Sequence, residues 1–392
     1  MTFFDNSNWK LTKFLLSCFG AWPSQSPKIR KIIRIAVFLL ITSIFIPEII
    51  RLITSWGDIN RVVECAPIFA LHSLTIVKMC NCLYNIDKIK ILLTTIQTDW
   101  ESPMTEEELK ILRDYGNQNR KITHSYVYFI YVVTAMFLAT PMVPKILDYY
   151  VPLNESRPQL SLYQTEYFVD PVQYEVPILI HAYIISPFPS TIIVAFDSLY
   201  ANFVGHACSM FAVVGYRLKN AVDDKYVWNK QRKIIQDNKA HQSMISCIKD
   251  HNSILEYCQI LKSSYNSCLF AIVVINMLAL TITGFQTVIK MDEISEMIRF
   301  GTFSIGQVVH LFFLSWPAQK LLDHSLSIHQ LVYLGEWYNI STRTKKLSIF
   351  IMMRSRKPCI LSAGKMYTMS CESFSRVIKT SMSYFTLLTS LR

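Results

Sequence analysis

Apolar residues in this chain gather into runs of about twenty, separated by polar segments rich in lysine and arginine. A helix of about twenty residues rises ~30 Å, which is the thickness of the hydrocarbon core of a bilayer. The pattern therefore predicts an all-α integral membrane protein with seven transmembrane helices. The expected spans are 32–53, 62–84, 123–143, 174–214, 267–285, 300–322 and 373–391, and the last of them is the most polar.

The fourth span is too long for the bilayer alone. Residues 174–218 would extend roughly 68 Å as one helix, of which only about 30 Å fits in hydrocarbon. Pro187 and Pro189 predict a kink in the outer half of this helix, because a proline removes a backbone hydrogen bond and crowds the preceding turn. The rest of the helix is expected to continue into the cytoplasm.

Two further segments also reach beyond the bilayer. Residues 227–266 form an amphipathic pattern that leads straight into the fifth span, and residues 316–337 extend the sixth. We therefore expect one domain that occupies the whole chain, 1–392. Its cytoplasmic helical extensions, at about 205–266 and 316–372, would form an anchor bundle through which subunits associate.

The last span carries a polar stripe. Arg376, Thr380, Ser383, Leu387 and Ser390 recur at helical spacing, so they share one face, and Leu387 is the one apolar member. Lipid would not tolerate such a face. The stripe is therefore either buried between helices and hydrogen-bonded there, or it lines a water-filled lumen in which a ring of Leu387 closes the conduit by dewetting. Spacing alone does not separate these two interpretations.

Composition and charge fix the environment and the orientation. The chain is 51% hydrophobic and only 17% charged, which excludes an ordinary soluble protein of 392 residues. The amino-terminal segment and the loops after the second, fourth and sixth spans hold 29 of the lysines and arginines, against seven in the remaining loops and the carboxyl terminus. Because basic loops stay cytoplasmic, the N-terminus is expected inside and the C-terminus outside. The net charge of +11 then faces anionic membrane lipid rather than nucleic acid.

The loop after the third span should lie outside the cell. It contains the glycosylation sequon at Asn154, whereas the second sequon, at Asn339, falls on the cytoplasmic side. We therefore expect a glycan at Asn154 only. None of the ten cysteines falls in residues 143–173, so a disulfide within this loop is not expected.

Motifs for catalysis, nucleotide binding and metal binding are missing from the sequence. There is no P-loop, no nucleophile elbow and no zinc-protease signature, and ten glycines are too few for a phosphate-cradling loop. The close pair His206 and Cys208 lacks the distant partners that a metal site needs. We expect neither an enzyme nor a bound cofactor or metal ion.

Three segments resemble the insect odorant receptor family. Residues 197–218 are similar to its fourth-helix signature, in the style of receptors from ants, and read DSLYANFVGHACSMFAVVGYRL. Residues 357–365 look like the segment that precedes the family's last helix, and residues 383–388 look like its C-terminal signature. The odorant coreceptor carries a long intracellular insertion that this chain lacks, so the resemblance is to a ligand-tuning subunit.

The resemblance implies a function. Members of the family are odour-gated, non-selective cation channels in the plasma membrane of sensory neurons, assembled as heterotetramers with the coreceptor, and the last helix (373–392 here) lines the pore. The family's constriction falls three residues after the signature tyrosine, which is Tyr384 here, and counting onward gives Leu387. The resemblance therefore favours the lumen interpretation. The expected pore residues are Thr380, Ser383, Leu387 and Ser390.

A small hydrophobic odorant would bind in the outer half of the membrane, among the second, third, fourth and sixth helices of the family fold. Such a site needs an apolar concavity with a few polar groups. The candidates are residues that share a face on each helix, namely Phe69, His72, Ser73, Tyr131, Thr134, Leu138, His181, Ile184, Phe188, Phe300, Phe303 and Ser304.

Other seven-helix functions remain as alternatives. A G-protein-coupled receptor needs an extracellular N-terminus, and the sequence lacks the Asp-Arg-Tyr and Asn-Pro-x-x-Tyr motifs of that class. A secondary transporter would be expected to show an internal repeat. A gustatory-type receptor channel ends in a Thr-Tyr motif followed by Gln-Phe, where this chain has Ser383 and then Ser390-Leu391.

Overall fold

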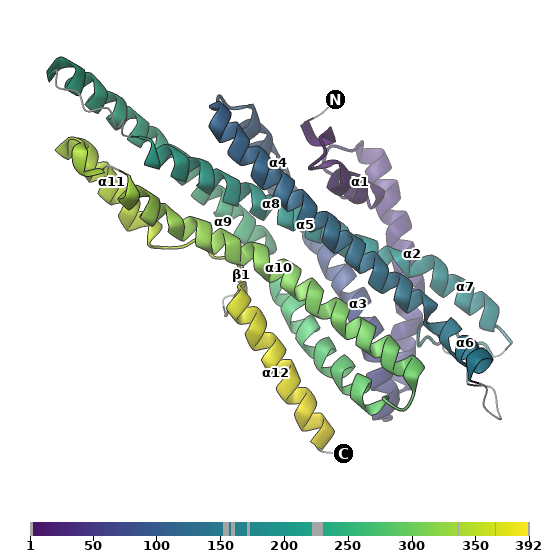
Figure 1. The fold of residues 1–392 in the computed structure, drawn as a ribbon. Helices are drawn as coiled ribbons and strands as arrows, with labels where there is room; N and C mark the ends of the chain where they lie inside the picture. Colours follow the sequence, from purple (N-terminus) through teal and green to yellow (C-terminus); the bar gives the residue numbers. More distant parts are fainter. Residues whose placement is uncertain are drawn as a thin grey trace.

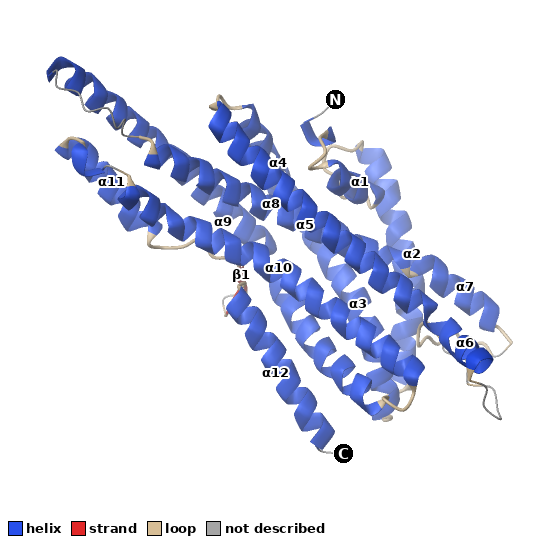
Figure 2. Ribbon diagram, viewed as in Figure 1, coloured by secondary structure: helices blue, strands red, loops and turns tan. Residues whose placement is uncertain are grey.

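A computed structural model describes residues 3–151, 157, 161–170, 173–221, 230–335, 337–364 and 366–390. Within these residues the protein is a bundle of long helices with one short hairpin (Figures 1 and 2). The elements are η1 (Phe3–Asp5), α1 (Lys10–Cys18), α2 (Pro27–Thr54), α3 (Ile59–Tyr84), α4 (Ile86–Glu101), α5 (Glu106–Ala139), η2 (Thr140–Met142), α6 (Val143–Tyr150), α7 (Glu175–Ile185), α8 (Pro187–Lys219), α9 (Lys230–Ile289), α10 (Ile294–Leu334), η3 (Trp337–Asn339), α11 (Thr342–Ser355), β1 (Ser362–Ala363), β2 (Tyr367–Thr368) and α12 (Cys371–Ser390).

The described residues of the seven expected spans are helical, apart from Tyr174 and from Ser186 at the kink. In the described part of the chain, six helical segments are long and apolar enough to cross a membrane, running from α2 to α10. The seventh, α12, has 20 residues, which is sufficient length for a bilayer. Its sequence is more polar than that of the other six, as the stripe already indicated.

The predicted kink is present, and the helices of the fifth and sixth spans are longer than a bilayer requires, as expected. Helix α7 ends at Ile185 and α8 begins at Pro187, because Pro187 and Pro189 cannot donate backbone hydrogen bonds to the preceding turn. Helix α9 runs unbroken for 60 residues from the amphipathic segment into the fifth span. Helix α10 continues through Pro317 to Leu334, which gives it 41 residues.

Helix α8 forms the centre of the bundle. It packs against α3, α5, α9 and α10, and the short α1 also lies on it. Its largest fully buried side chains, Tyr200, Phe203 and Phe211, belong to the main hydrophobic cluster of the molecule. A second, smaller cluster around Ile44, Phe137, Tyr163 and Ile185 lies near the α7–α8 kink.

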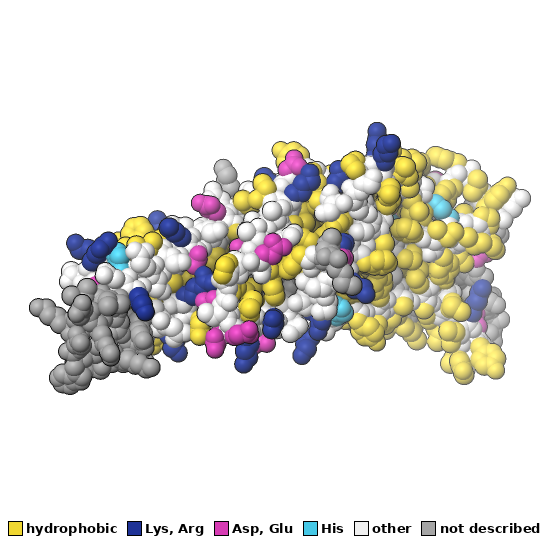
Figure 3. All heavy atoms as spheres, turned by 90° about the horizontal axis from the view of Figure 1, so that it is seen from above, with side chains coloured by type: hydrophobic (Ala, Val, Ile, Leu, Met, Phe, Trp, Pro, Cys, Tyr) yellow, Lys and Arg dark blue, Asp and Glu magenta, His cyan; other side chains and the backbone are white. Residues whose placement is uncertain are grey.

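Charged and apolar side chains separate along the bundle. In Figure 3, lysine, arginine and acidic side chains lie mainly on the part of the molecule that carries α11 and the beginning of α9. Hydrophobic side chains dominate the opposite part, towards α6 and α7. Large apolar side chains such as Ile32, Phe38 and Ile180 are exposed on the single chain, as expected for helices that face lipid.

The hairpin before α12 was not expected from the sequence. Strands β1 and β2 pair antiparallel through two residues each, and Gly364 in the turn has φ +65°, a left-handed conformation that favours glycine. A side chain at Gly364 would also press against the ring of Phe270 on α9. The hairpin thus fixes the start of α12 beside α9 (Figure 1).

Candidate ligand cavity and C-terminal helix

A cavity lies between α3, α5, α8, α9 and α10, towards the end of the bundle that carries the α9–α10 turn. The space that the centre of a water molecule can reach within it is about 80 Å³. Its walls are mainly apolar, with a few polar side chains among them. The lining residues are Leu71, Leu74, Ile130, Val133, Thr134, Phe137, Tyr163, Ser186, Ser190, Ile193, Asn276, Phe303, Gly306, Gln307 and His310.

The polar groups near the kink are bonded to one another. Thr134 and Ser190 lie 2.8 Å apart through their hydroxyl oxygens, and Thr134 is also 2.8 Å from the carbonyl oxygen of Ile130. Ser186 lies 2.8 Å from the hydroxyl of Tyr163. The kink therefore helps to form the wall of the cavity. It ends α7 just before Ser186, which bonds to Tyr163 of the loop, and Ser190 bonds to α5.

A buried ion-pair cluster adjoins the cavity through His310. Asp197 of α8 pairs with Lys78 of α3 and accepts a hydrogen bond of 2.7 Å from Tyr126 of α5. His310 of α10 lies 3.3 Å from the same carboxylate, and its other ring nitrogen is 3.3 Å from the side-chain oxygen of Asn276 on α9. Four helices therefore meet at one carboxylate, and α9 joins them through His310. His310 and Asn276 also line the cavity.

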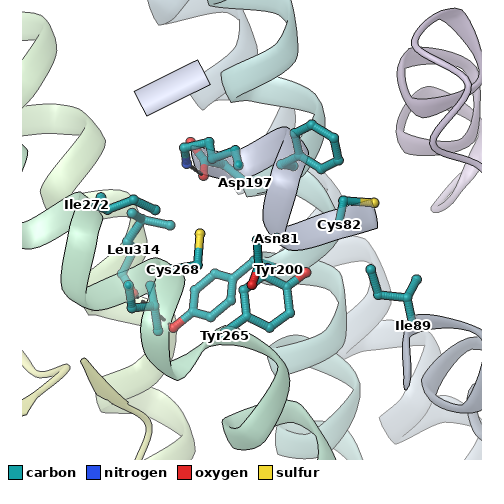
Figure 4. A pocket seen from close by; sticks show the side chains of 12 residues that line it. Asn81, Cys82, Ile89, Asp197, Tyr200, Tyr265, Cys268, Ile272 and Leu314 are labelled. Carbon is teal, nitrogen blue, oxygen red and sulfur yellow. Dashed lines mark hydrogen bonds and ion pairs between the residues drawn. The ribbon is translucent and has the colours of Figure 1, made fainter. Parts of the chain in front are cut away.

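A smaller hollow lies on the other side of Asp197. It holds only about 20 Å³, roughly the space that one or two water molecules need. Figure 4 shows Asp197 on one side of this hollow and the rings of Tyr200 and Tyr265 on the other, with their centroids 5.2 Å apart. Its size rules it out as an odorant site.

Two of the residues proposed from the sequence, Thr134 and Phe303, line the cavity. Two others, His72 and Leu138, pack behind its walls. His72 is fully buried, lies 3.0 Å from Glu48 and packs its ring against Tyr163. Leu138 packs on the cluster that contains Tyr163. Phe69 stacks on Phe45 rather than on a residue that lines the cavity.

The remaining candidates lie farther from the cavity. Tyr131 is 37% exposed and bonds Thr191, and Ile184 is 58% exposed, so both face outward from the single chain. His181 bridges Tyr167 and Ser43. Phe188 packs partly on the main core, Phe300 is buried, and the half-buried Ser73 and Ser304 do not line this cavity either.

Sequence reasoning missed the cavity's polar residues on α9 and α10. Asn276, Gln307 and His310 are isolated polar residues inside apolar spans, and such residues are rare unless they have a partner or a function. That rule could have identified them. Tyr163 carries no such signal, because it reaches the cavity from a loop.

The polar stripe on α12 is exposed in the single chain. All five residues, Arg376, Thr380, Ser383, Leu387 and Ser390, lie on the open face of the helix, and Leu387 is 53% exposed. Among the described residues, Ser383 and Ser390 hydrogen-bond only to carbonyl oxygens of α12 itself. Packing within the chain therefore does not explain the stripe.

The opposite face of α12 holds the helix against α9 and α10. Ser381 lies 3.4 Å from the carbonyl oxygen of Met277 on α9, and the rings of Phe374 and Phe312 meet at 5.5 Å across α12 and α10. Met277 directly follows Asn276, and Phe312 is two residues beyond His310. The contacts of α12 thus lie close in sequence to two residues that line the cavity.

The expected glycosylation site, Asn154, lies outside the described residues, as does Leu391 at the end of the last span.

Comparison with known proteins gives a consistent result. A family model described as "7tm Odorant receptor" matches residues 58–382. The chain is 21% identical to Odorant receptor Or2 of Anopheles gambiae over 349 residues, which cover 87% of each chain. It is 22% identical to Odorant receptor 10 of Aedes albopictus over 71% of this chain and 70% of that relative.

Solved structures show the same fold. The insect olfactory receptor OR5 from Machilis hrabei, in complex with eugenol, matches with a TM-score of 0.80 at 13% identity, over 98% of this chain and 97% of that one. A second structure of that receptor, described without eugenol, matches with a TM-score of 0.79. At this identity the match establishes the seven-helix fold.

Proposed function

This chain belongs to the insect odorant receptor family, and from that premise we propose that it is the odorant-binding subunit of a ligand-gated, non-selective cation channel. It is a multi-pass membrane protein, and its relatives are receptors rather than enzymes. In this proposal it assembles as a heterotetramer with the odorant coreceptor in the plasma membrane of sensory neurons. Small hydrophobic odorants bind in the cavity described above.

One observation supports the channel above all: α12 leaves a polar face open. Within a single chain, side chains such as Thr380 and Ser383 face outward from a helix of membrane-spanning length. A polar face is costly against lipid, whereas it is favourable along a water-filled conduit shared by several subunits. Leu387 then forms the apolar ring at which the conduit closes.

The position of the cavity supports ligand gating. Its walls include α9 and α10, the two helices on which α12 packs. A ligand that binds more tightly to one arrangement of these helices would shift the equilibrium between the closed and open states, and with it the position of α12. The size of this shift is set by the difference in the ligand's affinity for the two states. Ligand binding and the pore are then coupled through Asn276–Met277 on α9 and through 310–312 on α10.

Current recordings test the function. Cells that express this chain with the coreceptor should show a cation current when a panel of small hydrophobic volatiles is applied. Eugenol belongs in the panel because a receptor of the same fold binds it. Each partner expressed alone provides the control. If surface-expressed complexes give no current with any volatile, the channel proposal fails.

The orientation of the chain is a second part of the proposal. The basic residues favour a cytoplasmic N-terminus, an extracellular C-terminus and a cytoplasmic anchor at about 205–266 and 316–372. A C-terminal epitope tag should therefore bind antibody on unpermeabilised cells, and Asn154→Gln should remove the glycan while Asn339→Gln leaves it. A hidden C-terminal tag would reverse the orientation.

A further inference from the structure

We propose that the cavity selects neutral ligands that carry one hydrogen-bond acceptor, and that the side-chain amide of Gln307 is the group that binds this acceptor. The inference rests on the proposed role of the cavity as the odorant site. It adds a chemical class of ligand and a residue that determines specificity.

The size of the cavity limits the ligand. At about 10–15 Å³ for each water-sized sphere, a reachable space of about 80 Å³ corresponds to roughly six such spheres. A chain or ring of roughly six to ten non-hydrogen atoms fits this space. Apolar walls formed by residues such as Leu71, Ile130 and Phe137 favour a hydrocarbon body.

The lining excludes charged ligands. No lysine, arginine, aspartate or glutamate lies among the described residues that line the cavity. Asp197, the carboxylate beside the lining residue His310, already pairs with Lys78 and accepts a hydrogen bond from Tyr126. A charged ligand would therefore lose its hydration without gaining a counter-ion, which is strongly unfavourable.

Most polar groups of the lining already have partners. Thr134, Ser190, Ser186 and Tyr163 bond to each other or to helix carbonyls, and the amide nitrogen of Asn276 donates to the carbonyl of Ile272 at 2.8 Å. These groups gain less from a ligand oxygen than a donor with no partner would, because most of them already take part in hydrogen bonds within the protein, although Asn276 keeps a second amide hydrogen.

Gln307 differs from them. Its side-chain oxygen accepts from the hydroxyl of Thr283 at 3.4 Å, and its amide nitrogen has no hydrogen-bond partner among the described residues. The side chain is only 7% exposed, yet it lines the cavity. A ligand carbonyl or ether oxygen that reaches this amide nitrogen would give it a hydrogen bond that the described part of the protein does not supply.

A matched set of three probes tests the ligand class. Heptane has no hydrogen-bonding group, 2-heptanone has an acceptor, and heptylammonium carries a charge, while all three have similar bodies. Apparent affinities are measured from the concentration dependence of the thermal shift of the purified receptor in lipid nanodiscs, because a bound ligand stabilises the folded state. Wild-type receptor should bind 2-heptanone roughly five- to tenfold more tightly than heptane, and heptylammonium most weakly.

Two variants test the residue. Gln307→Met keeps the length of the side chain and removes the donor, so it should reduce the affinity for 2-heptanone roughly five- to tenfold and leave heptane unchanged. Leu71→Met replaces one apolar side chain of the wall by another of similar volume, so it should change the affinities for heptane and 2-heptanone by the same factor. Equal binding of heptane and 2-heptanone by wild type, or an equal loss of both in Gln307→Met, would overturn the inference, as would no detectable binding of any probe.

Currents recorded with the same probes separate this inference from the proposed function. Selective binding of 2-heptanone without any current would leave the assignment of Gln307 intact and contradict the channel. Current evoked equally by heptane and 2-heptanone would support the channel and contradict the assignment of Gln307.

Discussion

Helices α8 and α12 both have the length to cross the membrane, but they satisfy their polar groups in opposite ways. On α8, Asp197 bonds to α3 and α5, Asn202 to α1 and α5, and Arg217 to α5 and α9. On α12, Ser383 and Ser390 bond to their own helix. Apart from its packed face, α12 presents its side chains outward from the chain.

The difference shows which polar groups find partners on other helices of the same chain. The polar residues of α8 hold a closed core together, so their loss should reduce stability. The polar residues on the open face of α12 bond to no other helix among the described residues, so their loss should leave stability unchanged and alter whatever lies against that face. The following predictions test this division, in order of decreasing effect on the free energy of unfolding.

The largest effect is expected from Asp197→Leu. This change leaves the ammonium group of Lys78, which is almost completely buried, without its partner. Breaking a buried ion pair from one side typically costs about 3–5 kcal/mol. The loss should appear as a lower unfolding temperature and a smaller monodisperse fraction of the purified receptor.

The double variant Lys78→Met/Asp197→Leu is the control. It removes both charges, so it should recover most of the stability, since a well-packed apolar pair often replaces a buried ion pair without loss. If the single and double variants are equally unstable, side-chain packing rather than the ion pair stabilises this part of α8.

A smaller effect is expected at Gly215, where α8 meets α10 closely. A Cβ atom there would overlap the end of the Leu331 side chain, whereas a Cβ at Gly284, on the side of α9 facing α12, would meet the Phe385 ring at an ordinary 4.0 Å. Gly215→Ala should therefore destabilise the receptor by about 1–2 kcal/mol relative to Gly284→Ala. Chemical denaturation of the two variants side by side measures the difference, and equal stabilities would show that α8 is packed no more tightly than the neighbourhood of α12.

The contact between α10 and α12 should matter for coupling more than for stability. Phe374→Leu removes the aromatic pair with Phe312, which is worth about 0.5–1.5 kcal/mol, and keeps an apolar side chain. We expect a several-fold smaller maximal current while the thermal shift produced by ligand stays the same. Unchanged maximal current would show that this contact does not transmit binding to the pore.

The same contrast explains what the sequence could predict. Apolar run length located the six spans from α2 to α10, and Pro187 with Pro189 located the kink, because these signals act within one helix. The lining of the cavity depends on how each helix is rotated against its neighbours. Tyr131 and Thr134 share a face by spacing, yet Thr134 lines the cavity and Tyr131 is partly exposed. The loop residue Tyr163 and the hairpin around Gly364 depend on contacts distant in sequence, which spacing does not encode.

Helix α12 was the opposite case. Its stripe could be identified from the sequence because the residues of one exposed helix face recur at helical spacing, and this spacing does not depend on how neighbouring helices pack. What spacing left open was whether other helices of the same chain cover Ser383 and Leu387, and in the structure they do not. The assignment of this face to a pore remains the central proposal.

The resting current of Leu387→Ser tests that proposal most directly. The substitution should change the free energy of unfolding by no more than about 0.5 kcal/mol, because Leu387 is exposed in the single chain. If rings of Leu387 close the conduit by dewetting, a hydroxyl at this position should wet it and raise the current without ligand, while Ser383→Leu should lower the evoked current. Resting and evoked currents at wild-type levels in Leu387→Ser, with surface expression confirmed, would contradict the proposal that this face of α12 lines the pore.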